Sequence, residues 1–321
     1  MAVATPPAAA VPATVPATVP ATVRRRRPSG VQLAEWRDGW LFALPFILGV
    51  LIFWVGPMLY SLFLVTQDWD MLGTPKFVGL GNLRLILEDP LVFKSLLNTA
   101  YYTFIGVPIQ LTLALLLALA LNVPLRGRSI YRTIFYLPAI TPVVASAVVW
   151  NQIFNADFGV FNVVLRSIGL PGVKWLFEPA AAKPAFILMS LWIIGPQMVI
   201  FLAGLQNVPV ELLEAAQIDG ASTWQRFFSI TLPILSPVIF FNLIIGIIAS
   251  LQVFTNAFVM TNGGPQNSTL FMVLYVYLNG FRLFKMGFAA TLAWMLFWII
   301  MVFTFLQFKL SGRWVYYETK V

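Results

Sequence analysis

The chain has no cysteine and no histidine among its 321 residues. Without thiols and imidazoles it lacks the groups for disulfides, thiol nucleophiles, imidazole bases, haem ligation and most zinc sites. We therefore expect no catalytic residues, no cofactor and no metal site, so the protein is not expected to be an enzyme.

Charge is also scarce. Only 10% of the residues are charged, whereas 60% are hydrophobic and the mean hydropathy is +0.85. Such a chain cannot cover a soluble surface with polar groups, so we expect an all-α integral membrane protein in contact with lipid. The net charge of +8 arises from Lys and Arg scattered between apolar runs. That distribution fits charges flanking membrane helices better than nucleic-acid binding.

Residues 1–38 differ in composition from the rest. A Val-Pro-Ala-Thr unit recurs within residues 1–23, and four arginines follow at positions 24–27. We expect residues 1–38 to form a disordered cytoplasmic tail, because Pro-rich repeats favour extended conformations without a packed core. The arginines follow the Pro-rich region instead of preceding an apolar one, which favours a topological anchor over a cleaved secretion signal. Residues 39–321 are expected to form the transmembrane domain.

Six windows are long and apolar enough to cross a membrane, which needs about 20 residues per helix. They are residues 41–65, 97–121, 135–153, 186–205, 237–259 and 288–308. Pro233 and Pro237 are expected to mark a helix terminus before the fifth span, because proline removes a helical hydrogen bond. The apolar residues 269–277 are too few to cross, so we expect an interfacial or re-entrant segment on the outer side.

An even number of spans places both termini on the same side of the membrane. That side carries 12 of the 20 Lys and Arg residues, concentrated in the tail and at positions 126–132. The positive-inside rule therefore predicts that both termini, and the loop between the fourth and fifth spans, are cytoplasmic.

This loop, residues 206–235, holds the most specific motif of the chain. Glu214, Ala215 and Ala216 are followed by Asp219-Gly220 and then by Ile230-Thr-Leu232-Pro233. Pro209 suits the first turn of a short helix and Gly220 suits its end. Ser222 and Gln225 have the spacing of a capping box at the start of a second short helix. We therefore expect a helix-turn-helix between two spans.

The motif resembles the cytoplasmic coupling loop of ABC importer permeases of the carbohydrate type, relatives of the maltose and glycerol-phosphate systems. The resemblance extends over nearly all of the chain from residue 41. The other matching residues are Asn98, Thr99, Arg132, Leu137, Pro138, Trp150, Gly159, Asn162, the Thr261-Asn-Gly-Gly-Pro265 segment, Ser268 and Thr269.

The resemblance implies a six-span type I importer permease fold in a bacterial inner or plasma membrane. It implies three kinds of partner: a homodimeric ATP-binding subunit, a second permease forming a heterodimer with this one, and an extracytoplasmic solute-binding protein. The implied substrate is a sugar or polyol. The implied ATPase-coupling residues are Glu214, Ala215, Ala216, Asp219, Gly220, Ile230, Leu232 and Pro233.

Other transport mechanisms remain open from the residues alone. The chain has no Gly-x-x-x-x-Gly-Lys-Ser/Thr phosphate loop, so energy must come from another subunit or from an ion gradient. Residues 227–281 contain no Asp, Glu, Lys or Arg, which counts against an ion-coupled secondary transporter. A channel lacks a recognisable selectivity filter here. Within the ATP-driven mechanism, another polar solute such as glycerol 3-phosphate is the alternative substrate.

Uncharged polar residues in the spans are candidate substrate contacts. Gln197 follows the Gly195-Pro196 break in the fourth span, and Gln252 and Asn256 lie four residues apart in the fifth. We expect the latter two to share one helical face. By the resemblance, these three amides and Trp192 line the substrate path. The alternative is that the amides bind neighbouring helices together.

Overall fold

The computed structural model describes residues 30–124 and 126–316. The chain divides into two compact units, Met1–Pro57 and Met58–Val321. In the first, α1 (Gly30–Val50) continues into a π-helical turn, η1 (Leu51–Val55), and α2 (Gly56–Leu64) begins at its end. Residues 30–38, which we expected to belong to the tail, are therefore helical. The rest of the predicted tail lies outside the described residues.

The second unit is almost entirely helical. Its two short strands, β1 (Gln67–Asp68) and β2 (Lys76–Phe77), form an antiparallel pair with Gln67 opposite Phe77. Up to the loop after the fourth span, the helices are α3 (Gly81–Glu88), α4 (Pro90–Asn122), α5 (Arg128–Tyr136), η2 (Leu137–Ile140), α6 (Val143–Ile153), α7 (Val160–Ser167), α8 (Pro179–Ser190), η3 (Leu191–Ile193) and α9 (Gly195–Gln206). They continue with α10 (Val210–Ile218), α11 (Thr223–Arg226), η4 (Phe227–Thr231), α12 (Leu232–Leu251), α13 (Thr255–Met260), α14 (Met272–Tyr277), η5 (Leu278–Arg282) and α15 (Met286–Ser311).

Among the described residues, four helical stretches are long and apolar enough to cross a membrane, and two bent pairs raise the number to six. The four are Ala34–Leu64, Pro90–Asn122, Thr223–Met260 and Met286–Ser311. The predicted third span, 135–153, is wrong as a single helix, because the chain bends by 100° between η2 and α6. Pro138 and Pro142 lie at this bend, and each removes a helical N–H donor. The fourth span bends by 50° before Gly195.

The fifth span also differs from the prediction. Pro237 lies inside α12 and does not end a helix. The helix instead runs on from α11 through the π-helical turn η4 and into α12, with Pro233 in the first turn of α12. The second short helix of the loop and the span are thus one continuous element.

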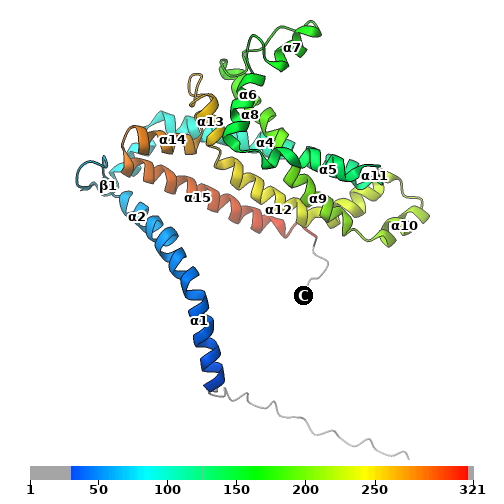
Figure 1. The fold of residues 1–321 in the computed structure, drawn as a ribbon, viewed down its shortest axis with the longest axis horizontal. Helices are drawn as coiled ribbons and strands as arrows, with labels where there is room; N and C mark the ends of the chain where they lie inside the picture. The colour runs from blue at the N-terminus through cyan, green and yellow to red at the C-terminus, as the bar shows by residue number, and fades with distance from the viewer. Residues whose placement is uncertain (1–29, 125, 317–321) are drawn as a thin grey trace, which may run out of the picture. The chain divides into compact units, whose positions relative to one another are not determined.

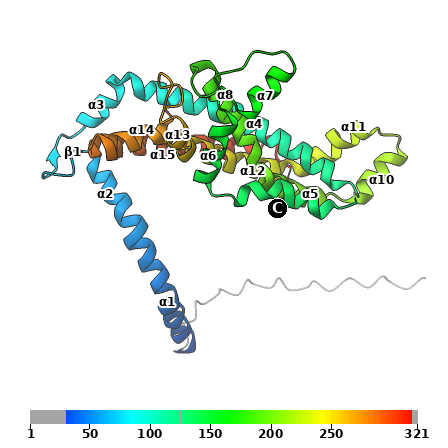
Figure 2. The ribbon, with the colours of Figure 1, turned by 45° about the horizontal axis from the view of Figure 1, so that its top comes forward.

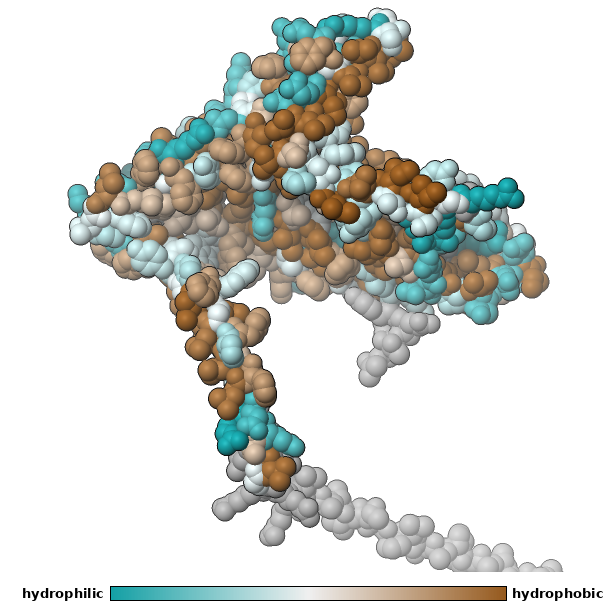
Figure 3. Space-filling view, viewed as in Figure 1, coloured by the Kyte–Doolittle hydropathy of each residue, from teal (hydrophilic) through white to brown (hydrophobic). Residues whose placement is uncertain are grey.

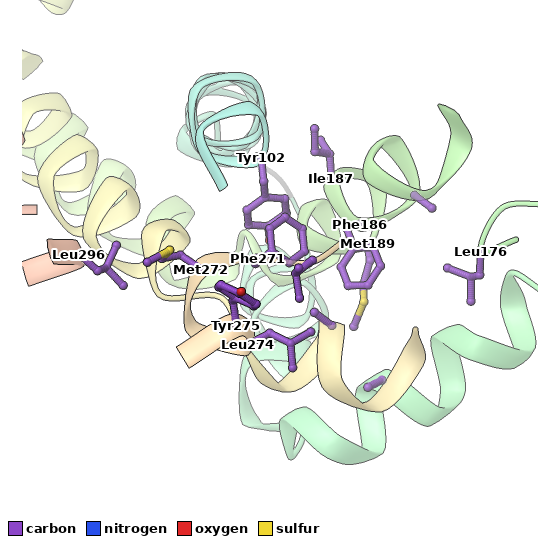
Figure 4. Close-up of a cluster of buried hydrophobic side chains, with 14 of the residues drawn as sticks. Tyr102, Leu176, Phe186, Ile187, Met189, Phe271, Met272, Leu274, Tyr275 and Leu296 are labelled. Atoms are coloured by element: carbon purple, nitrogen blue, oxygen red, sulfur yellow. The ribbon is translucent and has the colours of Figure 1, made fainter. Parts of the chain in front are cut away.

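Two apolar clusters hold this unit together. In the first, the ring of Phe271 lies 5.4 Å from that of Tyr102 and 5.7 Å from that of Phe186, centroid to centroid. Figure 4 shows these side chains within the cluster. The second cluster joins α4, α9 and α12. There α9 crosses α12 at Gly204, where a Cβ atom would come within 2.7 Å of Leu235. A larger residue would force these helices apart.

The predicted re-entrant segment is α14 with η5, packed against α4 and α15. The hydroxyl of Tyr275 on α14 donates a hydrogen bond to Asp89, and the Asp89 side chain also caps α4 by accepting from the amide of Leu91 at 2.9 Å. In the described part of the chain, this segment is not a candidate span.

Candidate functional site

The loop after the fourth span folds as a helix-turn-helix built on Gly220. Helix α10 ends at Ile218 with Asp219 as its C-cap, and Gly220 has φ +81°, in the left-handed region. The Gly220 amide donates to the carbonyl of Gln217 at 3.1 Å, and the Ala221 amide donates to that of Ala216 at 2.9 Å. This pair of bonds is a Schellman motif, in which the final carbonyls of a helix are satisfied by the turn that follows. The predicted helix end at Gly220 is confirmed.

A capping box opens the second helix, as the spacing predicted. The Ser222 hydroxyl accepts from the Gln225 amide at 3.3 Å, and the Gln225 side chain accepts from the Ser222 amide at 2.7 Å. Arg226 adds a tie across the turn, because one guanidinium nitrogen donates to the Gln217 side chain at 3.0 Å. Pro209 is the residue before α10, one position earlier than expected.

The turn and its two helices present both charge and apolar surface. Glu214, Ala215 and Asp219 are exposed, and Ala216 is half-buried. Ile218 is 87% exposed and Trp224 is 72% exposed. The Trp224 ring stacks on Phe228 with centroids 6.0 Å apart.

An exposed apolar cluster beside carboxylates is typical of a protein-binding surface. The motif did not point to Ile218 and Trp224 as candidates for such a surface. Large apolar side chains next to a helix-ending glycine, in an otherwise polar loop, were the available signal.

The last three residues of the motif lie at the base of this structure instead of at its tip. Ile230 is in η4, Leu232 and Pro233 begin α12, and all three are half-buried. A groove of about 480 Å³ runs between this base and α10. Its lining residues are Asn207, Pro209, Leu212, Ser229, Ile230, Pro233, Ile234, Pro237 and Tyr316.

Helices α10 and α11 lie at one end of the bundle formed by α4, α9, α12 and α15, and α3 and α14 lie at the other (Figures 1 and 2). Figure 3 shows hydrophilic side chains at the α10–α11 end and again around α7, while the visible sides of the bundle between them are largely hydrophobic. This distribution is that of a helical bundle with its sides in lipid and its loops in water.

The candidate substrate-path residues all lie where a helix breaks. Trp192 is in η3, 37% exposed, and its ring meets that of Trp150 edge-on with centroids 6.0 Å apart. Gln197 is in the first turn of α9, just after the 50° bend. Its side-chain oxygen is buried and has no hydrogen-bond partner among the described residues.

Gln252 and Asn256 do not share a helical face, so that expectation is wrong. Helix α12 ends at Leu251, residues 252–254 are not helical, and Asn256 belongs to the separate helix α13. Gln252 is exposed at the end of α12. Asn256 is half-buried, and its side-chain oxygen is buried without a partner within the described structure. No hydrogen bond joins any two of the four path residues, all of which the structure describes.

Several motif residues outside the loop form a separate network at the start of α4. Asn98 is 3% exposed, and its amide donates to the carbonyls of Asn267 at 2.7 Å and Leu270 at 3.1 Å. The Thr99 hydroxyl accepts from the Met272 amide at 2.9 Å, and Thr269 donates to the Gly264 carbonyl at 2.6 Å. These residues fix the 261–269 segment against α4, so their role is structural.

Asn162 is a second buried organiser. Its side chain is fully buried, and it accepts from the amide of Val173 at 2.9 Å and from the indole of Trp175 at 3.1 Å. It also donates to the carbonyls of Ala156 and Val173, each at 2.9 Å. One amide thereby closes the loops on both sides of α7.

Comparison with known proteins identifies relatives over almost the whole chain. The family model described as "Binding-protein-dependent transport system inner membrane component" matches residues 29–316. The chain is 44% identical over 287 residues to the probable ABC transporter permease protein YesP of Bacillus subtilis, covering 88% of this chain and 93% of YesP. It is 39% identical to the lactose transport system permease protein LacF of Rhizobium radiobacter over 280 residues, which are 84% of this chain and 93% of LacF.

Solved structures agree. A chain of a bacterial ABC transporter involved in the import of the acidic polysaccharide alginate superposes with a TM-score of 0.77 at 25% identity, covering 89% of this chain and 99% of that one. The structure of a bacterial alginate ABC transporter in complex with a periplasmic protein bound to an alginate pentasaccharide gives the same TM-score over 88% of this chain. The expected all-α type I importer permease fold is confirmed.

Proposed function

Because this chain belongs to the family of inner membrane components of binding-protein-dependent transport systems, we propose that it is one permease subunit of an ATP-driven importer for a sugar or polyol. The sugar assignment is supported by relatives such as the lactose permease LacF and the trehalose/maltose permease MalF of Thermococcus litoralis, 34% identical over 285 residues. In this mechanism a second permease completes the pore, a homodimeric ATPase drives it, and an extracytoplasmic solute-binding protein delivers the substrate. Both termini of the chain are cytoplasmic.

The helix-turn-helix at Gly220 carries the coupling part of this proposal. Its tip combines exposed carboxylates with the exposed side chains of Ile218 and Trp224. Its two helices are locked together by the Schellman motif, the capping box and the bond from Arg226 to Gln217. A preorganised helix-turn-helix of this kind can be displaced by a partner subunit without changing its shape, because its internal hydrogen bonds hold the angle between the two helices.

The substrate path is proposed to run past the breaks in the fourth and fifth spans. Discontinuous helices expose backbone and side-chain polar groups to a translocation pathway instead of to lipid. The unpartnered buried oxygens of Gln197 and Asn256 are acceptors suited to sugar hydroxyls, and the exposed ring of Trp192 is suited to the apolar face of a sugar.

Charge reversal at Glu214 tests the coupling contact. Glu214→Lys should weaken ATPase binding by about tenfold or more, because like charges brought together at an interface cost several kcal/mol. Glu178→Lys, which reverses another exposed carboxylate just before α8, is the matched control and should leave ATPase binding unchanged. Binding is measured on permease purified in detergent. Normal ATPase binding and ATP-driven transport by Glu214→Lys would remove Glu214 from the interface.

Alanine substitution at Asn256 tests the path. The variant should assemble with its partners at the wild-type level and transport substrate more slowly. Loss of assembly would instead assign Asn256 to helix packing.

A further inference from the structure

The last described residues, 312–316, fold back onto the helix that leaves the coupling loop. After α15 the amides of Trp314 and Val315 donate to the Ser311 carbonyl at 3.1 and 2.8 Å, which turns the chain sharply. The ring of Phe240 on α12 then lies edge-on between Phe308, at 5.3 Å, and Trp314, at 5.8 Å. Val315 is buried. The segment from Gly312 to Tyr316, which we call the carboxyl-terminal latch, is therefore packed against α12.

The carboxyl-terminal latch is attached to α12 where a helical hydrogen bond is missing. Pro237 has no N–H, so the carbonyl of Pro233 cannot accept its usual helical bond. The Ser236 hydroxyl donates to that carbonyl at 2.6 Å. The Ser236 hydroxyl oxygen in turn accepts a hydrogen bond from the backbone amide of Tyr316 at 2.8 Å. Ser236 is 4% exposed, whereas Tyr316 is 53% exposed, so the two bonds are partly buried and begin from a buried serine.

The latch also reaches the coupling region. Tyr316 lines the same groove as Pro209, Leu212 and Ile230, which belong to the loop before α10, to α10 itself and to the base of the helix-turn-helix. The segment that follows the sixth span, α10 and α12 therefore line one groove.

We infer that Ser236 and the Tyr316 amide are positioning groups for coupling: they fix the end of the sixth span to α12 so that both move together when the ATPase moves the helix-turn-helix. The inference rests on the proposed function. It also explains why Pro237 follows Ser236. Pro237 leaves the Pro233 carbonyl free, and the Ser236 hydroxyl that donates to this carbonyl presents its oxygen to the Tyr316 amide.

Two substitutions each remove one partner of the hydrogen bond between Ser236 and Tyr316. Tyr316→Pro deletes the donor amide, and Ser236→Ala deletes the hydroxyl. Tyr316→Ala keeps the amide and is the control for the ring. Ser311→Ala is the control for a buried serine hydroxyl, because within the described residues that hydroxyl bonds only to the Phe308 carbonyl of its own helix, at 2.8 Å. Each variant is assayed in the full transport complex, as substrate molecules transported per ATP hydrolysed.

We expect Tyr316→Pro and Ser236→Ala each to lower this ratio by about twofold to tenfold, the range of one net hydrogen bond. The double variant should be no worse than either single one, because both act through the same bond. Both controls should match wild type. A normal ratio for Tyr316→Pro in assembled complex, additive effects, or a fall in assembly alone would overturn the inference. Failure of the wild-type complex to couple ATP hydrolysis to transport would instead overturn the proposed function.

Discussion

Replacement of Gly220 should disturb the proposed coupling turn without disturbing the folding of the spans. Gly220 has φ +81°, and a Cβ atom placed there meets no heavy atom within 4 Å. Alanine therefore introduces no clash, and its effect is the conformational cost of a left-handed non-glycine residue, about 1–2 kcal/mol. Opening of the turn should become about 5 to 30 times more frequent. Gly220→Pro should abolish the turn, since proline fixes φ near −65° and removes the amide that donates to Gln217.

Hydrogen exchange of the α10 and α11 amides measures this opening directly. The Ala221 amide, bonded to Ala216, should lose protection in the order wild type, Gly220→Ala, Gly220→Pro. ATPase binding and ATP-driven transport should fall in the same order. The amount of permease in the membrane should stay at the wild-type level, because the turn lies outside the packed spans.

Gly169 supplies a matched control. It also ends a helix, α7, with φ +80° and no heavy atom within 4 Å of a built Cβ. The Gly169 and Leu170 amides donate to Arg166 and Leu165 in the same Schellman pattern, at 3.1 and 2.9 Å. Gly169→Ala should loosen its own turn equally and leave ATPase binding unaffected. Full transport by a well-expressed Gly220→Pro variant would refute the coupling assignment.

Two further predictions concern the network at the start of α4. Asn98→Ala should lower the free energy of unfolding by about 1–3 kcal/mol, because the buried carbonyl of Leu270 and the partly buried carbonyl of Asn267 lose their donor, and thermal unfolding in detergent should show this as a lower Tm; an unchanged Tm would contradict the structural role. Burial and the bond to Asp89 raise the pKa of Tyr275 to about 12, above its ordinary value of about 10. The folded state holds this proton more tightly, so the hydroxyl's contribution is complete below about pH 10 and is lost toward pH 12. The Tm difference between wild type and Tyr275→Phe should therefore stay constant between about pH 7 and 9 and shrink above pH 10.

The sequence was most informative where structure depends on neighbouring residues. The capping box of Ser222 with Gln225 and the helix end at Gly220 involve groups a few residues apart, so their spacing alone specifies the bonds. The span positions also follow from composition, because lipid tolerates only long apolar helices. The expected likeness to carbohydrate importer permeases rested on such local motifs and is confirmed across the chain.

The errors arose where the contacts of particular side chains override the conformational preference of the local sequence. Pro237 is compatible with the interior of α12 because the Ser236 hydroxyl satisfies the carbonyl that proline leaves free. The fifth span breaks at residues 252–254, Gln-Val-Phe, although these contain neither glycine nor proline. Phe254 has φ −139° and ψ −66°, and its ring packs against Phe258 and Tyr277, with centroids 5.4 and 5.1 Å away. Such packing with a residue on α14 leaves no trace in helical periodicity, so the shared face of Gln252 and Asn256 was wrongly predicted.

Because α11, η4 and α12 are continuous, the break at residues 252–254 is where a movement of this helix can change its direction relative to α13. From Thr223 to Leu251 the chain is one unbroken helical rod, roughly 40 Å long at 1.5 Å per residue. One end carries the proposed coupling helix-turn-helix, and the other stops at Leu251, beside the proposed substrate path. A rod packed against α4 and α9 over this length transmits a displacement instead of absorbing it, because close-packed interiors deform little. The nearest place where the motion can be taken up is residues 252–254, where helical hydrogen bonding stops. A tilt of the helix-turn-helix would therefore change the direction of α12 relative to α13, and with it the separation of Gln252 and Asn256.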